Sequence, residues 1–77
     1  MKYVLLGFTF EGRFGTPGTL HMVLFSTHGV KVWEATVEVD SGRYTHLVNT
    51  QHVANGVYYL RVHKDGKEQV LKVVKRR

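Results

Sequence analysis

The chain has 77 residues, of which 43% are hydrophobic and 12% aromatic, and its formal net charge is +5 at pH 7. This apolar content is too high for an intrinsically disordered chain, and the absence of cysteine excludes disulfides and thiolate metal sites. The longest uninterrupted apolar run falls far short of the roughly 20 residues that a membrane-spanning helix needs, so no membrane insertion is expected.

The length and the placement of charge predict one small domain with a basic end. A chain of this length forms a single domain, here residues 1–77, and buries about 60% of its unfolded surface. Residues 1–60 hold four basic and four acidic residues, whereas residues 61–77 hold seven basic residues against Asp65 and Glu68. Solubility alone explains a charge excess of this size, although the excess also suits an acidic partner.

The first half of the chain is predicted to form β-strands separated by turns. Residues 2–11 alternate and predict one strand, with a single face made of Val4, Leu6, Phe8 and Phe10. Residues 12–18 contain the only proline and predict a loop, and residues 19–26 predict the next strand. Across residues 30–40 the apolar positions change parity near Trp33, which indicates either two strands or one bent strand with a bulge.

The second half adds strands at residues 43–49, 57–63 and 68–75. Asn55-Gly56 predicts a sharp turn onto the second of these strands, and Asp65-Gly66 predicts the turn of a hairpin that joins the second to the third. No window shows helical spacing. Strands that recur every 8–12 residues or so are typical of a sandwich or a barrel. The sequence therefore predicts an all-β fold of six or seven antiparallel strands.

The five histidines form no recognisable metal motif. No two of them have the HxH spacing that places both rings on one face of a strand, and HExxH is absent. His21 and His63 fall opposite the apolar parity and are expected in solvent. His46 shares its parity with Tyr44 and Val48 and is expected to point inward. Because an inward histidine is more often a hydrogen-bonded core residue than a ligand, no metal is predicted.

Catalytic motifs are missing as well. Ser26 and Ser41 stand in no nucleophile motif, and the few carboxylates lie in turns or at outward positions. The glycine-rich residues 11–18 precede no helix whose N-terminus could bind phosphate. The sequence therefore predicts no enzyme activity, no cofactor and no small-molecule substrate.

Two binding functions are alternatives to a protein-interaction role. A small basic β-barrel binds single-stranded nucleic acid when basic residues and stacking rings share one face. Tyr59 and Arg61 point outward from one predicted strand, and Arg13 and Phe14 lie in the predicted loop, but such residues are sparse and nucleic acid is the less favoured partner. A carbohydrate- or cell-surface-binding sandwich would need an exposed platform made of Trp33, Tyr44 or Tyr59.

Several residues have the spacing of a known family. An apolar strand ends in a turn with Gly29, a GxY follows at Gly42, a GVY follows at Gly56, and the basic KVVK comes near the terminus. This order resembles the C-terminal sorting domain of type IX secretion cargo over nearly the whole chain, and the Ig-like domain of flagellar hook-capping proteins is also similar. The matching residues are Gly29, Val32, Gly42, Tyr44, Gly56, Val57, Tyr58, Lys72, Val73, Val74 and Lys75.

The resemblance implies an immunoglobulin-like antiparallel β-sandwich that targets a secreted or cell-surface cargo protein to an outer-membrane export apparatus. The partner is then a protein, and the oligomeric state stays open. The residues expected to define the fold are Gly29, Gly42, Tyr44, Gly56, Val57 and Tyr58. The residues expected to be recognised are Lys72, Val73, Val74, Lys75, Arg76 and Arg77. Tyr58 is expected to bury its ring and to bind a nearby backbone group through its hydroxyl, as a tyrosine corner does.

Overall fold

The computed structural model describes residues 2–6 and 8–76, with the side chains of residues 2 and 4–6 left out. These residues form seven β-strands. No helix long and apolar enough to cross a membrane occurs in them. The strands are β1 Lys2–Leu6, β2 Thr9–Phe14, β3 Gly18–Ser26, β4 Lys31–Val39, β5 Gly42–Leu47, β6 Gly56–Lys64 and β7 Lys67–Lys75.

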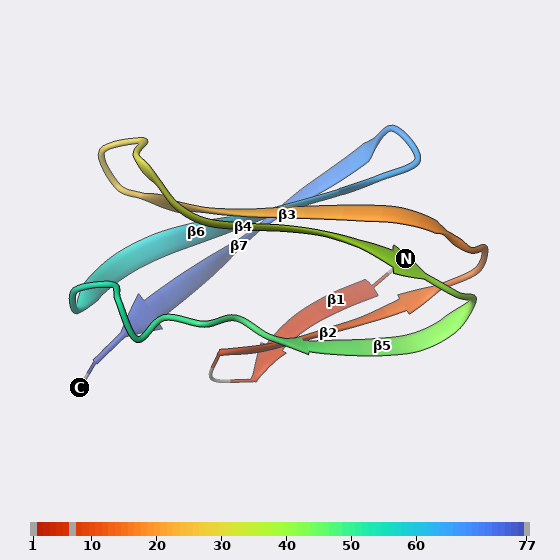
Figure 1. The fold of residues 1–77 in the computed structure, drawn as a ribbon, viewed down its shortest axis with the longest axis horizontal. Coiled ribbons are helices and arrows are strands. Elements are labelled where there is room, and N and C mark those ends of the chain that lie inside the picture. Colours follow the sequence, from red (N-terminus) through yellow and green to blue (C-terminus); the bar gives the residue numbers. More distant parts are fainter. Residues whose placement is uncertain (1, 7, 77) are drawn as a thin grey trace.

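The strands form two antiparallel sheets that face each other (Figure 1). One sheet has the order β1-β2-β5, and the other has the order β4-β3-β6-β7. The chain passes from one layer to the other between β2 and β3, between β4 and β5, and between β5 and β6. Two stacked sheets of this kind confirm the predicted all-β, immunoglobulin-like sandwich, with seven strands.

The N-terminal region differs from the sequence prediction. Residues 2–11 are not one strand, because Leu6 pairs with Thr9 and the chain therefore reverses direction between β1 and β2. Because of this reversal, Tyr3 in β1 and Phe10 in β2 are both buried, although one position is odd-numbered and the other even-numbered. The predicted loop at residues 12–18 is also too long, since β2 continues to Phe14 and β3 begins at Gly18.

Two local predictions in the second sheet are confirmed. Leu24 pairs with Trp33 but Phe25 pairs with Lys31, so β4 is one strand with an irregularity beside Trp33. Asp65 and Gly66 have φ angles of 54° and 76° and join β6 to β7 as a two-residue turn. Positive φ at both positions is the geometry that matches the twist of a hairpin.

The Asn55-Gly56 prediction is only half right. Asp65 is the only non-glycine residue with positive φ in the described part of the chain, so Asn55 does not adopt the predicted turn conformation. Gly56 has a φ of 154° and begins β6, where the chain enters the second sheet after leaving β5. The dipeptide therefore belongs to a crossover between the layers, and not to a tight hairpin.

The core lies between the two sheets and is rich in aromatic rings at one end. Its fully buried side chains are Phe10, Leu20, Met22, Leu24, Leu60 and Val62. The ring of Tyr3 lies 5.4 Å from that of Phe10 and 5.7 Å from that of Phe14, between centroids. A Cβ at Gly12 would lie 3.0 Å from ring atoms of both Tyr3 and Phe14. Glycine at this position therefore leaves the space that the three rings fill.

Candidate functional site

The candidate site lies on β7, the strand at one edge of the four-stranded sheet, which ends near the C-terminus (Figure 1). Side chains along β7 alternate between the two faces of the sheet. The odd-numbered positions 69, 71, 73 and 75 are buried or half-buried, whereas the even-numbered positions 68, 70, 72 and 74 are exposed. The basic segment predicted from the sequence is therefore divided between the core and the solvent.

The outward residues of β7 join a partly apolar surface. Val70 and Val74 are 53% and 43% exposed, and Tyr59 on β6 is 38% exposed. Tyr59 stands directly opposite Lys72 in the register of β6 and β7. Together these four residues place three exposed apolar side chains and one cation on the outer face of the sheet.

Two of the sequence-predicted recognition residues face inward. Val73 is only 4% exposed and pairs with Tyr58. The ammonium of Lys75 donates hydrogen bonds to the backbone carbonyls of Thr50 and, at 2.6 Å, of Val53. These two side chains hold the end of β7 in place. Arg76 is exposed, and Arg77 lies outside the described residues.

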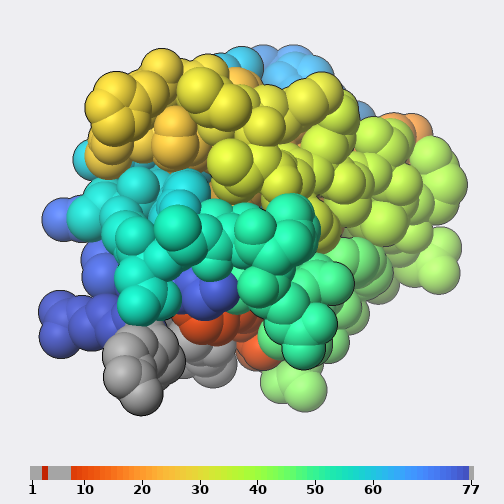
Figure 2. All heavy atoms as spheres, turned by 60° about the vertical axis from the view of Figure 1, so that its left-hand side comes forward, coloured from red at the N-terminus to blue at the C-terminus, as the bar shows by residue number. Residues whose placement is uncertain are grey.

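Lys75 and Tyr58 both bind the crossover segment, residues 48–55, which connects β5 to β6. The hydroxyl of Tyr58 donates a 2.6 Å hydrogen bond to the carbonyl of Ala54, and its ring is buried. This is the tyrosine-corner geometry expected from the sequence. In Figure 2 the crossover segment (teal) extends across the side of the molecule between β4 (yellow to yellow-green) and a small area of N-terminal residues drawn in red. It closes that side of the sandwich.

The other predicted fold residues lie in turns or at the junction of the two layers. Gly29 and Gly42 have φ angles of 80° and 107°, which side chains with a Cβ rarely adopt. The hydroxyl of Tyr44 lies 2.9 Å from Nδ1 of His46, whose ring lies 5.7 Å from that of Trp33 on the facing sheet. His46 is thus half-buried, as its parity predicts. Val57 is half-buried at the start of β6.

The structure does not bring the proposed nucleic-acid-binding residues together. Phe14 is buried against the ring of Tyr3, so it offers no surface for stacking. Arg13 lies in the three-stranded sheet, whereas Tyr59 and Arg61 lie in the four-stranded sheet. The guanidinium of Arg61 stacks over the ring of Phe25, 4.6 Å from its centroid. These residues therefore form no continuous basic and aromatic face.

The three rings proposed for a carbohydrate platform also separate. Trp33 and Tyr44 are half-buried and pack against the core. Tyr59 is exposed on β6, a strand that does not pair with either of theirs. The three rings therefore do not form one platform.

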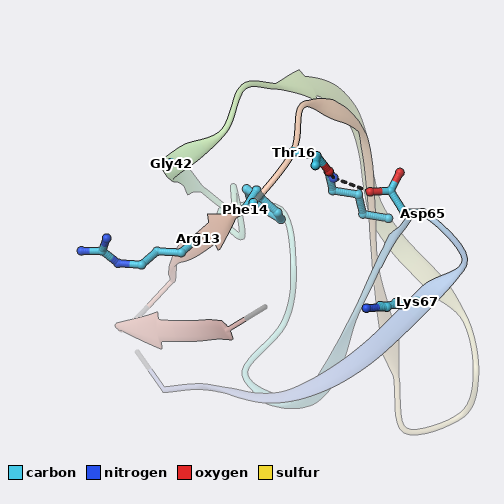
Figure 3. Close-up of a pocket in the computed structure, with 8 residues that line it drawn as sticks. Arg13, Phe14, Thr16, Gly42, Asp65 and Lys67 are labelled. Atoms are coloured by element: carbon cyan, nitrogen blue, oxygen red, sulfur yellow. Dashed lines mark hydrogen bonds and ion pairs between the residues drawn. The ribbon is translucent and has the colours of Figure 1, made fainter.

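A hollow of about 530 Å³ at one end of the sandwich contains a buried cation that the sequence analysis missed (Figure 3). Lys64 is only 2% exposed, and its ammonium lies 2.5 Å from the Asp65 carboxylate and 3.3 Å from the Thr16 hydroxyl. This contact with Lys64 holds the pKa of Asp65 below its usual value. Lys64 has the parity of Leu60 and Val62, so the alternation of β6 could have predicted its burial.

His21 and His63 lie directly opposite each other in the register of β3 and β6, and the other three histidines lie elsewhere in the fold. Nε2 of His21 lies 2.5 Å from the Glu34 carboxylate, which also accepts a 2.7 Å hydrogen bond from Lys31. The hydrogen bonds from Lys31 and His21 lower the pKa of Glu34. Within the described residues, no group of three or more histidine, aspartate or glutamate side chains could hold a metal ion.

No curated protein and no solved structure matches the chain. A family model, described as a secretion system C-terminal sorting domain, matches residues 8–76. This range includes every strand from β2 to β7, with the tyrosine corner and the basic segment up to Arg76. Since the match covers far more than half of the chain, the chain belongs to the family of type IX secretion C-terminal sorting domains.

Proposed function

We propose that this chain is a non-enzymatic sorting domain that directs a secreted or cell-surface cargo protein to a type IX outer-membrane export apparatus. The apparatus binds the domain through a protein–protein contact. Membership of the sorting-domain family supports this function. The alternation of side chains along β7 is the observation that supports the location of the contact. Lys72 and Val74 are exposed to solvent, whereas Val73 and Lys75 hold the strand to the body of the fold.

The basic segment at residues 72–77 is the proposed recognition site, with two kinds of contribution. Lys72, Val74 and Arg76 are exposed and contact the partner directly, together with Arg77. Val73 and Lys75 act indirectly, because their core and crossover contacts fix the position of the exposed side chains. Exposed cations mainly set orientation and association rate, whereas apolar side chains at the centre of a contact supply most of the affinity.

The test is secretion of a passenger protein fused to this domain in a type IX-competent bacterium. Removal of residues 73–77 is expected to stop secretion, but it also removes the core side chain Val73. The sharper variant is therefore the double substitution Lys72→Glu and Arg76→Glu, which changes exposed positions only. It is expected to reduce secretion strongly while the thermal unfolding of the purified domain stays close to that of the parent.

The matched control is the double substitution Arg13→Glu and Arg43→Glu. These arginines are exposed, pair across β2 and β5 in the other sheet, and undergo the same change in charge. Secretion of the control is expected to stay near that of the parent. Equal secretion by both double variants and the parent, or secretion unaffected by removing residues 73–77, would contradict the proposal.

A further inference from the structure

The unpaired backbone edge of β7 is a second surface of this strand, separate from the side chains of the proposed recognition site. Among the residues that the structure describes, β6 is the only strand that pairs with β7, although β7 is nine residues long. The two strands pair without any register shift from Lys64↔Lys67 to Gly56↔Lys75. A long and regular edge strand of this kind presents a row of unpaired backbone groups to which another strand can bind.

The register determines which backbone groups face the open edge. The Asp65-Gly66 turn places Lys64 opposite Lys67 as the closing pair of a two-residue hairpin, and such a pair is hydrogen-bonded. Hydrogen-bonded and non-hydrogen-bonded pairs then alternate along the ladder. The N–H and C=O groups directed away from β6 therefore belong to Glu68, Val70, Lys72 and Val74.

The opposite edge of the same sheet is protected, and this contrast is informative. On β4 the register shifts opposite Leu24 and Phe25, and Nε2 of His52 lies 3.0 Å from the carbonyl oxygen of Val32. The exposed side chains of Glu34 and Glu38 add negative charge along β4. Irregular pairing, a covering segment and edge charges are the means by which proteins prevent strand addition. The pairing of β7 with β6 has no such irregularity, and β1 of the facing sheet lies close to β7 without pairing with it. β7 does carry edge charges, and Glu68 and Lys72 are both exposed.

The side chains beside the open edge indicate which partner fits. Those on the outer face alternate as Val70, Lys72 and Val74, with a cation between two exposed apolar residues. A neighbouring strand complements this pattern when it carries an acidic residue opposite Lys72 and apolar residues opposite the two valines. A second copy of β7 fits poorly, because residues 67–76 carry four basic side chains and one acidic one.

We propose that a partner protein binds this domain by adding a β-strand to the open edge of β7. The added strand has an acidic side chain opposite Lys72, flanked two residues away on each side by apolar side chains that cover Val70 and Val74. Backbone hydrogen bonds supply affinity and the alternating side chains supply selectivity, as in other cases of strand addition. This inference rests on the proposed function for the identity of the partner as part of the export apparatus, but the binding mode is testable without it.

A synthetic peptide tests the mode directly. The probe has seven residues, with glutamate at the fourth position, valine at the second and sixth, and threonine elsewhere. When it is added to the ¹⁵N-labelled domain, the amides of Val70, Lys72 and Val74 are expected to shift and to exchange their protons more slowly. A control peptide with lysine in place of the glutamate is expected to bind about fivefold more weakly. No protection of these amides by the acidic peptide, or equal binding of both peptides, would overturn the proposal.

A backbone substitution separates strand addition from contact with the outer face alone. Val70→Pro removes an N–H that faces the open edge and not one that bonds to β6, and proline is tolerated at such edge positions. Val70→Ala shortens the same side chain but keeps the N–H. The peptide is expected to bind the alanine variant and to lose binding to the proline variant. Equal binding to both folded variants would indicate that the outer face suffices, and would overturn strand addition. If the proline variant does not fold, the protection of the parent domain's amides by the acidic peptide is the measurement that tests strand addition.

Secretion of the fused passenger then distinguishes the two proposals. A defect in the Lys72→Glu and Arg76→Glu variant, together with equal secretion by the folded Val70→Pro and Val70→Ala variants, would retain the sorting function and reject strand addition. Peptide binding with normal secretion by every variant would retain strand addition as a property of the edge and reject the proposed recognition site. If both proposals are correct, a secretion defect is expected in the proline and charge-reversal variants only.

Discussion

The hydroxyl of Tyr58 donates a 2.6 Å hydrogen bond to the backbone carbonyl of Ala54, four residues earlier in the chain. The bond joins the start of β6 to the crossover segment, while the ring of the same residue is buried between the sheets. Tyr59, the next residue, points to the other face of the sheet and is exposed. Adjacent tyrosines therefore have opposite roles, one in folding and one on the surface.

The Tyr58 contacts are expected to contribute strongly to stability. Tyr58→Phe removes only the hydrogen bond and is expected to lower the free energy of unfolding by about 1 kcal/mol. Tyr58→Ala also removes the buried ring and is expected to cost about 3–5 kcal/mol. Urea denaturation measures both. Tyr59→Ala is the control, with an expected loss of no more than about 1 kcal/mol, and a larger loss there than at Tyr58 would contradict this assignment.

Lys75 is expected to matter for stability and Lys72 is not. Lys75→Met removes the hydrogen bonds to the carbonyls of Thr50 and Val53, and hydrogen bonds from charged groups contribute about 1.5–3 kcal/mol each when they are well formed. The variant is expected to be less stable and to exchange its amide protons faster across residues 48–55. Lys72→Met loses the same charge from an exposed position and is expected to leave exchange in that segment unchanged. Equal exchange in the two variants would show that Lys75 does not hold the crossover segment.

Gly12 is expected to tolerate no side chain. A Cβ there would lie 3.0 Å from ring atoms of Tyr3 and Phe14, so Gly12→Ala crowds the core and is expected to cost about 1–3 kcal/mol. Gly15→Ala is the matched control, because no heavy atom lies within 4 Å of a Cβ at that position. Thermal denaturation of the two variants should show a lower midpoint for the first only. Similar midpoints would contradict the packing of these rings around Gly12.

The pairing of Asp65 with Lys64 predicts how stability changes in acid. The hydrogen bond from Lys64 lowers the folded-state pKa of Asp65 below its ordinary value of 3.8. The stability from this carboxylate is therefore fully present above pH 3.8 and is lost as the pH falls through the lower folded-state pKa. Asp65→Asn keeps a residue that tolerates positive φ but removes the charge. Urea denaturation at a series of pH values should show weaker acid dependence in this variant, and an unchanged pH profile would contradict the prediction.

The burial of Lys64 predicts that a second substitution offsets the first. Asp65→Asn leaves a buried ammonium without its carboxylate, which is more costly than having no charge at that position. Lys64→Met in the same chain replaces the ammonium by an apolar side chain of similar length. The double variant is expected to regain at least about half of the stability that Asp65→Asn loses. Additive losses, measured by denaturation of all four chains of the cycle, would show that the two residues are not coupled.

Much of the sandwich could be predicted because alternation reports the direction of each side chain. The face of Leu20, Met22 and Leu24, the irregularity beside Trp33 and the Asp65-Gly66 turn all follow from local patterns. The β1–β2 hairpin was missed because the even-numbered positions from Val4 to Phe10 are apolar without interruption. Gly7-Phe8 has the Gly-X order of a two-residue hairpin loop, but the uninterrupted alternation across it favours a single strand, and only the pairing of Leu6 with Thr9 shows the reversal.

The candidate site was predicted as a segment but not as a surface. The sequence locates the basic residues from Lys72 onward, yet it does not tell which of them bind the rest of the domain. The Lys75 ammonium faces the carbonyls of a segment more than twenty positions away, and only tertiary structure brings the two together. The position of Tyr59 beside Lys72, in contrast, follows from the sequence, because a two-residue turn at Asp65-Gly66 fixes the register of the hairpin and Tyr59 is predicted to point outward.

The order of strands in the sheets has a consequence for the rate of folding. The pairs β1–β2, β3–β4 and β6–β7 join neighbours in the chain, but β2 must find β5 and β3 must find β6 before the two layers are complete. Closing these long loops costs chain entropy before the contacts compensate for it, and proteins dominated by such non-local pairing fold in about milliseconds to seconds instead of microseconds. None of the three local hairpins is expected to be stable alone, so we expect the domain to fold slowly and cooperatively, with the distant pairings of β2 to β5 and β3 to β6 limiting the rate.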